Sequence, residues 1–490
     1  MFPDPRNLSA YDRFSFPSTT EEASIRSFIS TAENEIAKLE QTIAGLRSSV
    51  ALQKSIIAPV RRLPPELLSY IFVIADASTM GERLSRQTKN LVIGVNAAWR
   101  AVALSTPSLW SKILLDGAVQ HMYPSRKVNS LLSRQLKLSL QYPLTITYIS
   151  YWQNFSLRGC LALLLEHAHH WKDVYLHLGD DDDEIFQTSS VAFPLLERLD
   201  VAGSDDIYAA PTGVDLTLRC PKISSLSLHS DLHWHPRSLL VPWTRLASVK
   251  LHAEPQFIQE TLNLAHQLTS AELYPLRTLP SDLQQTRRVE HPQLSVLKIH
   301  NQEATLREDH YLHDLFSLLQ APALRELDFE PNAFKREELD LSITSSLLSF
   351  ISSSRCSLTR LNYRGDADQQ AFLKILSLVP TLEYLVFAPQ FNDIPFSFIR
   401  SLIRSGSDTL LPALIALELD GMLEDERDLR ADIERMLHSR NAETGAGTLH
   451  RGDRVIEAMS KGKGWSSSIV WCQLPPAMYL LMFLPSNQMA

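Results

Sequence analysis

The 490-residue sequence predicts an α/β protein: a long N-terminal helix, a short all-α module, and an irregular repeat region with a parallel sheet. Three observations support this prediction: a heptad pattern before Pro59, a surplus of apolar residues in the short helical stretches that follow, and a strand-like motif that returns ten times. The length suggests two or three domains, and an apolar fraction of 44% is enough to give them cores.

Composition narrows the class of partner. The net charge is −8, and Lys and Arg are scattered rather than clustered, so we expect no nucleic-acid binding. The N-terminus lacks a secretory signal, and no apolar run approaches the roughly 18 residues of a membrane span. We therefore expect a cytoplasmic or nuclear protein that does not bind a membrane. The four cysteines lie far apart in the sequence, which favours reduced buried thiols over disulfides or paired metal ligands.

Residues 1–20 are polar and contain three prolines, so we expect a disordered tail. A helix over 21–58 follows, because apolar residues recur at alternating steps of three and four. The heptad a positions are Ile29, Ile36, Ile43, Val50 and Ile57, and the d positions are Ala32, Leu39, Leu46 and Gln53. Branched residues at a with leucine at d favour a parallel two-stranded coil, and hence a homodimer. The alternative is a single helix that folds back on the next domain.

The next stretch, 59–115, contains "LPPELLSYIF" from Leu63 to Phe72. Pro64 and Pro65 suit a first helical turn, where the missing N–H would be unpaired in any case. Leu91, Val95, Ala98 and Val102 form an apolar stripe on a second expected helix. Such short helices cannot bury all this surface among themselves, which indicates contact with a partner. The alternative is a small bundle docked wholly on its own repeat region.

The order Leu-Pro, Glu-Leu-Leu, Val-x-x-x-Trp-Arg and Pro-x-Leu-Trp resembles the F-box family. This resemblance covers about 55 residues and implies binding to a Skp-type adaptor, which bridges to a cullin and a RING subunit. The adaptor-binding residues that it implies are Leu63, Pro64, Leu67, Ile71, Phe72, Val95, Trp99, Leu109 and Trp110. The connector between the two halves of the motif is longer than the family usually carries, and Asn96 stands where a cysteine often follows the valine.

Between 116 and 437, a six-residue pattern with apolar first, fourth and sixth positions recurs ten times, from "WKDVYL" at Trp171 to "LIALEL" at Leu414. Many copies follow a proline turn, and stretches such as "QQAFLKILSLV" between them are expected to be helical. The pattern resembles leucine-rich repeats, which implies a solenoid with one parallel strand per repeat and helices on the convex side. The copy with Ala271 at its fourth position is the weakest. Where such repeats usually carry Asn, this chain has Asn332 once, but elsewhere Asp231, Gln302, Asp366 and Gln390.

The solenoid would present alternate strand residues on a concave face. We expect target binding there, by Arg198, Asp200, Lys250, Arg325, Glu326, Asp328, Arg360, Asn362 and Tyr384. Their mixed charges suit a protein target. Tyr384 and Arg360 are the expected anchors, because Tyr and Arg are enriched among binding hot spots.

Catalytic and metal patterns are weak. The histidines of "HAHHW" at 167–171 and the acidic run "DDDDE" at 180–184 have the chemistry of metal ligands, but a helix end and a solvated loop explain them better. No phosphate loop or nucleophile elbow is present. We therefore expect no enzyme activity, no catalytic residue, no metal and no cofactor. For residues 438–490 three alternatives stay open: the segment caps the last repeat, it anchors the chain to something else, or it reflects a wrongly translated gene.

Together these features predict a substrate-recognition subunit of an SCF-type E3 ubiquitin ligase, with the adaptor on the F-box-like helices and a target protein on the repeats. The alternative is a repeat scaffold that assembles proteins without ubiquitin. Co-purification with the adaptor would separate the two.

Overall fold

The computed structural model describes residues 18–77, 82–117, 124–150, 157, 159–178, 191–202, 215–229, 240–275, 288–300, 310–330, 342–365, 367–389, 396–404, 409–421, 432, 435–436, 439–440 and 467–472. The predicted tail before residue 18, the acidic run at 180–184 and the five positions compared with the repeat Asn lie outside these residues. The chain divides into two compact units. The N-terminal unit comprises 1–78 and 90–103, and the C-terminal unit comprises 79–89 and 104–490.

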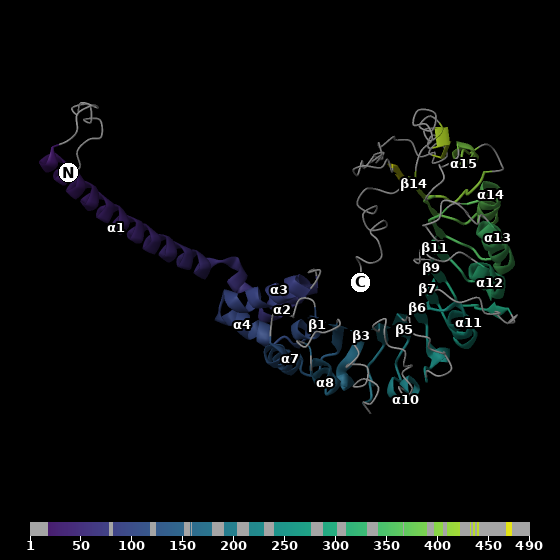
Figure 1. Ribbon diagram of the computed structural model, residues 1–490, viewed down its shortest axis with the longest axis horizontal. Coiled ribbons are helices and arrows are strands. Elements are labelled where there is room, and N and C mark those ends of the chain that lie inside the picture. Colours follow the sequence, from purple (N-terminus) through teal and green to yellow (C-terminus); the bar gives the residue numbers. More distant parts are fainter. Residues whose placement is uncertain are drawn as a thin grey trace. The chain divides into compact units, whose positions relative to one another are not determined.

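The N-terminal unit begins with α1 (Thr19–Ile57), a single helix of 39 residues (Figure 1). A capping box starts it: the Glu21 amide donates to Ser18 Oγ, and the Ser18 amide donates to the Glu21 carboxylate at 2.9 Å. This contact with Ser18 lowers the pKa of Glu21. The five predicted a positions are all exposed, from 46% at Ile43 to 73% at Ile57. In this structure the helix therefore does not fold back on the helices that follow.

A 3-10 turn η2 (Pro59–Arg62) leads to α2 (Pro65–Ala77), α3 (Glu82–Val95) and α4 (Ala97–Leu104). The stripe expected on one helix, Leu91 to Val102, is therefore divided between two helices. Asn96 causes the break: its side-chain Oδ1 accepts a hydrogen bond from the Trp99 amide at 2.8 Å, which caps α4. Arg100 Nε donates to the Ile93 carbonyl at 3.1 Å and satisfies one of the free carbonyls at the end of α3.

The C-terminal unit is a mixed α/β structure built on one large sheet (Figure 1). In the described residues, twelve strands are parallel and follow one another in sequence order, and β15 (Ser467–Cys472) pairs antiparallel at the end. The other strands are β1 (Lys112–Asp116), β2 (Leu144–Ile149), β3 (Trp171–His177), β4 (Arg198–Ala202), β5 (Ser225–His229), β6 (Ser248–Ala253), β7 (Ser270–Pro275), β9 (Val296–His300), β11 (Glu326–Glu330), β12 (Arg360–Tyr363), β13 (Tyr384–Phe387) and β14 (Ala416–Gly421). A separate pair joins β8 (Val289–Glu290) and β10 (Leu319–Gln320).

Helices connect these strands and lie along one face of the sheet, most clearly α11 to α14 (Figure 1). They are α5 (Pro107–Trp110), α7 (Ser125–Ser139), α8 (Cys160–Leu165), α10 (Leu216–Arg219), α11 (Pro255–Leu264), α12 (His310–Leu318), α13 (Ser342–Ser354), α14 (Gln369–Leu378) and α15 (Phe396–Ser401), with the 3-10 turns η4 (Ala168–His170) and η5 (Trp243–Arg245). Two stretches expected to be helical, "HYLHDLFSLLQ" and "QQAFLKILSLV", correspond to α12 and α14. No described helix is both long and apolar enough to cross a bilayer.

All ten copies of the six-residue pattern form parallel strands, β3 to β7, β9 and β11 to β14. The copy with Ala271 is a full strand, because Ala271 is completely buried beneath the helices. Five of the described strands were not predicted: β1, β2 and β15 of the large sheet, and the separate pair β8 and β10. The sheet thus begins at Lys112, inside the range 59–115 that we assigned to the F-box-like module.

Proline turns precede six of the strands and repeat one geometry. In each turn, the carbonyl of the residue before the proline accepts a hydrogen bond from the amide of the second residue after the proline, with N–O distances of 3.1 to 3.3 Å. The six prolines are Pro194, Pro221, Pro292, Pro322, Pro380 and Pro412. The residue before the proline is buried each time: Phe193, Cys220, His291, Ala321, Val379 and Leu411. Burial in this position raises the pKa of the Cys220 thiol to about 12, as expected of a reduced core cysteine.

The end of the sheet is closed by part of the segment that we could not assign from the sequence. Arg440 is buried, and its guanidinium donates to the carbonyls of Leu402, Leu411 and Leu410 at 3.0, 2.9 and 2.8 Å. Burial lowers the pKa of Arg440 to about 10, which leaves it charged at neutral pH. Together with β15, Arg440 contributes to the end of the sheet.

Candidate protein-binding surfaces

Helix α2 is apolar on two sides. Leu68 and Phe72 lie one turn apart and are buried, while Leu67, Tyr70, Ile71 and Ile74 form an exposed stripe that we call the α2 stripe. Between 46% and 65% of each of these four residues is exposed. In the same unit, Leu91 and Val95 of α3 are also exposed. A helix of 13 residues with this much exposed apolar surface is typical of a protein-binding site.

The predicted adaptor-binding residues separate by burial. Pro64, Leu67, Ile71 and Val95 are exposed, and Leu63 and Trp99 are half-buried. Phe72 is only 2% exposed, and its ring packs against Trp99 with centroids 5.0 Å apart. Assigning direct adaptor contact to Phe72 therefore needs correction: its side chain belongs to the interior of the unit.

Leu109 and Trp110 need the same correction. Both are buried in the C-terminal unit, in the short helix α5 that leads into β1. Gln135 of α7 donates to the carbonyls of Trp110 and Lys112, which attaches this turn to the sheet. The Pro-x-Leu-Trp part of the motif is thus the first layer of the sheet unit, and its side chains are not available on the surface.

The second candidate surface is the face of the sheet away from the helices, which we call the open face. Eight of the nine predicted target-binding residues lie there, because they alternate with buried strand residues such as Leu199, Leu327 and Leu361. Arg325 is the exception, since it lies one residue before β11. Register places Lys250 beside Ser227 and Asp328 beside Asn362.

Charges on the open face are largely paired across neighbouring strands. Arg198 contacts Asp173 at 2.9 Å, Lys250 contacts Glu272 at 2.9 Å, and Arg360 lies 3.9 Å from Glu326. The two expected anchors also touch, because the Arg360 guanidinium lies 4.9 Å from the centre of the Tyr384 ring. These side chains are held in place before any target arrives.

A row of rings crosses the open face and was missed in the sequence. His229, His252, Tyr274 and His300, on four adjacent strands, stack with centroid distances of 4.0, 3.9 and 5.0 Å; we call them the ring stack. His229 contacts Asp200 at 3.1 Å at one end, and His300 contacts Glu330 at 3.2 Å at the other. A signal was present: each ring directly follows one copy of the six-residue pattern.

The ring stack is electrostatically uneven. Burial, with smaller contributions from His229 and Lys250, lowers the pKa of His252 to about 3, so this ring stays neutral. Burial alone would raise the pKa of Glu272, but hydrogen bonds from Lys250 and Tyr274 bring it below its usual value. Asp328 differs, because burial raises its pKa although Asn362 forms a hydrogen bond with its carboxylate. Among the described residues, its Oδ1 atom is buried without a hydrogen-bond partner.

The histidines of "HAHHW" contact one another: His169 and His170 meet edge to face with ring centroids 4.0 Å apart, and His167 stacks on His169 at 6.4 Å. Burial lowers the pKa of His170. Within the described parts of the chain, no group of three or more His, Cys, Asp or Glu residues is placed to hold a metal ion.

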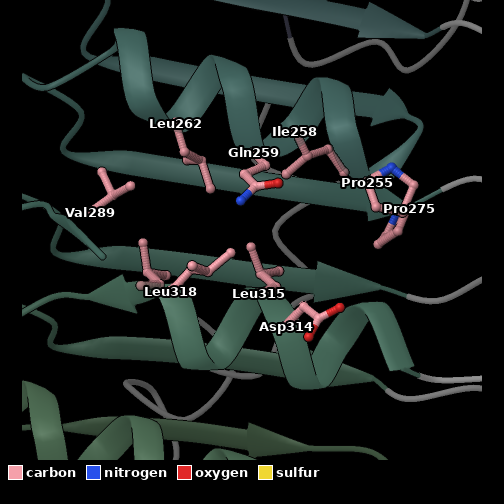
Figure 2. Close-up of a pocket in the computed structure, with 10 residues that line it drawn as sticks. Pro255, Ile258, Gln259, Leu262, Pro275, Val289, Asp314, Leu315 and Leu318 are labelled. Atoms are coloured by element: carbon pink, nitrogen blue, oxygen red, sulfur yellow. The ribbon is translucent and has the colours of Figure 1, made fainter. Parts of the chain in front are cut away.

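A small groove, with a cavity volume of about 30 Å³, lies between α11 and α12 on the helix side of the sheet (Figure 2). Ile258, Leu262, Leu315 and Leu318 project into it from the two helices, and the lining is mainly apolar. None of the residues that we predicted as sites lines this groove.

Comparison with known proteins adds no assignment. No protein-family model matches the chain, and no curated protein matches it significantly. The F-box and leucine-rich-repeat resemblances therefore depend on the motifs and on the structure described above.

Proposed function

We propose that this chain is the substrate-recognition subunit of an SCF-type E3 ubiquitin ligase. In this proposal the N-terminal unit binds a Skp-type adaptor, and the C-terminal unit, an irregular leucine-rich-repeat solenoid, holds a target protein for ubiquitin transfer by other subunits. The chain itself contributes binding and positioning, and no catalysis.

The α2 stripe carries the adaptor half of the proposal. Leu67 and Ile71 lie one turn apart and are 51% and 46% exposed, so a partner can cover them together. Pro64 and Leu63 extend this surface at the start of the helix. Full burial of a Leu or Ile side chain contributes roughly 1.5–3 kcal/mol, so about half as much remains to be gained at each exposed position.

The motif residues that lie inside the N-terminal unit give further support to the proposal. Trp99 packs on Phe72, and Arg100 caps α3, so the Trp-Arg pair fixes how the helices meet. The departure at Asn96 has a local explanation as a helix cap and removes no apolar contact. These interactions hold the α2 stripe outward on a folded scaffold.

The open face supports the target half. It offers cation-π, aromatic and charged side chains in a fixed arrangement. A target protein with charged side chains on an exposed segment suits these mixed charges.

The test is capture of a purified Skp-type adaptor by the full chain with Leu67→Asp and Ile71→Asp. Burying each unpaired aspartate in the contact would cost several kcal/mol, whereas the whole binding free energy of a micromolar complex is about 8 kcal/mol. We expect affinity to fall by more than about 100-fold. Leu131→Asp with Leu378→Asp, at exposed positions on α7 and α14, is the matched control and should bind normally. Undiminished capture by the first variant would show that the adaptor does not bind the α2 stripe, and no capture by the unchanged chain would leave the alternative, a scaffold that works without ubiquitin.

A further inference from the structure

The exposed heptad seam of α1 fits a second copy of this chain, and its charges indicate the orientation of that copy. Along the 39-residue helix, Ile36, Leu39, Ile43, Leu46 and Val50 are all 46–63% exposed. An isolated helix with this seam leaves much of its apolar surface in water. We propose that α1 pairs with α1 of a second copy as an antiparallel two-stranded coil over residues 25–57. This proposal does not depend on the ligase assignment.

The antiparallel arrangement pairs the apolar positions of the seam with one exception. When Ile43 faces Leu39 of the second copy, Ile36 faces Leu46, Val50 faces Ala32, Ile57 faces Ile25, and Ile29 faces the polar Gln53 of that copy. Four of these five layers join two apolar residues, and the small Ala32 meets a larger residue. A parallel arrangement in register would instead place Ala32 against Ala32 and leave a thin layer.

The charges beside the seam give the stronger argument. Glu33, Glu40, Arg47 and Lys54 all occupy heptad position e, which flanks the core. In an antiparallel pair, e residues meet e residues, and each side chain leans toward the N-terminus of its own helix. With the seam aligned as above, Glu40 reaches Arg47 of the second copy and Glu33 reaches Lys54. Two-fold symmetry makes four opposite-charge pairs.

The parallel alternative brings like charges together. There a g residue meets the e residue five positions later, so Glu35 would face Glu40 of the second copy, twice by symmetry. One kind of attractive pair would form as well, between Glu21 and Arg26, also twice by symmetry. Arg26 already pairs with Glu22 within the helix, and Glu35 lies 3.7 Å from Lys38.

Within the described chain, the four e-position charges have no such partner. No ion pair among the described residues involves Glu33, Glu40, Arg47 or Lys54. In contrast, Arg26 at an e position and Glu35 at a g position form ion pairs within their own helix, and the antiparallel coil does not need them. The antiparallel coil therefore uses the charges that one chain leaves unused.

A single charge reversal separates the two orientations by the sign of its effect. In the antiparallel coil, Glu40→Lys places a lysine against Arg47 of the second copy at two symmetric sites. Reversing two exposed pairs should raise the dimer dissociation constant of the full chain by roughly tenfold at low salt. In the parallel coil the same change would replace Glu35–Glu40 repulsion by attraction and tighten the dimer. Gln41→Lys, on the outward f position, is the control and should change little.

The companion variant Glu40→Lys with Arg47→Glu restores opposite charges in the antiparallel coil and should return the dissociation constant to near the wild-type value. Sedimentation equilibrium of the full-length chain measures all three variants. A chain that stays monomeric at every concentration, a Glu40→Lys variant that dimerises as well as or better than wild type, or a double variant that is not rescued would overturn the proposal.

A distance measurement gives an independent readout. In a Cys472→Ser background, a spin label at Ser27→Cys would be separated from its copy by 28 residues along the antiparallel coil, or about 42 Å. In a parallel coil the two labels would lie at one level, under about 30 Å apart. Gln41→Cys, at the centre of the antiparallel overlap, should give a short distance in both. A short distance at Ser27 would contradict the antiparallel coil.

Discussion

His291 should make the C-terminal unit sensitive to mild acid. It precedes the proline turn before β9 and is completely buried, in the position where other turns place Phe193, Ala321, Val379 or Leu411. Among the described residues, neither of its ring nitrogens has a hydrogen bond of good geometry, and contact with the Leu262 backbone raises its pKa less than burial lowers it. Burial, with a smaller contribution from nearby His266, lowers its pKa to about 4.

The sign and size of the effect follow from proton linkage. In the unfolded chain a histidine has a pKa near 6.5, so between pH 6.5 and 4 the unfolded state binds a proton that the folded state does not. Stability is therefore highest above pH 6.5 and falls as the pH decreases through this window. With pKa values of about 6.5 and 4, this one group accounts for a loss of about 2 kcal/mol between pH 7.5 and 5.0.

The variant His291→Leu isolates this contribution. Leucine fills a similar volume, as Leu411 does in the equivalent turn, and it removes two unsatisfied buried nitrogens. Urea unfolding followed by circular dichroism at both pH values should show that the variant loses about 2 kcal/mol less than wild type on acidification. Replacement of the exposed His169 by leucine is the control. If His291→Leu keeps the full wild-type pH dependence, the buried neutral histidine is not the cause.

Three further outcomes are expected. Arg440→Met should destabilise the chain by about 3 kcal/mol in thermal unfolding, because three buried carbonyls lose their charged donor, and an unchanged midpoint would contradict this. Asp328→Asn should stabilise the chain by about 1 kcal/mol at pH 8, and the gain should shrink as the pH falls, because the raised pKa lets the wild-type carboxyl take up its proton earlier in the folded than in the unfolded chain; equal stability at pH 8 would show that Oδ1 is satisfied. Arg360→Ala with Tyr384→Ala should weaken the binding of proteins retained by the open face at least tenfold, and full retention would mean that the target surface is wrongly placed.

The repeat strands were predictable because their signal is strong and recurrent. Each copy has a buried apolar residue at its first and fourth positions and, in six cases, a proline turn before it. β1 and β2 escaped because they precede the first recognisable copy, and "KILLD" directly follows the helix α5 without a turn of that type. β15 pairs with β14 from 46 residues further along the chain, from Gly421 to Ser467, and no local pattern specifies so distant an antiparallel pairing.

The candidate surfaces were predictable in place but not in detail. Helix α2 is apolar around most of its circumference, so periodicity alone could not decide that Phe72 points inward while Ile71 points outward. We interpreted Asn96 as a departure from a family pattern. Asn is also a common N-cap residue, because its side chain can accept a hydrogen bond from the amide three residues later, as it does here from Trp99. The ring stack needed the strand register, because rings 22 to 26 residues apart in sequence become neighbours only when the strands align.

The most direct test of the central claim is whether the purified chain binds a purified Skp-type adaptor at all. Isothermal titration calorimetry at several temperatures would measure this. A contact through the α2 stripe predicts one adaptor per chain, a dissociation constant of about 1 µM or lower, and a negative heat-capacity change from burial of apolar surface. The absence of binding at about 100 µM adaptor, or binding without a heat-capacity change, would contradict the assignment of this chain as a ligase subunit.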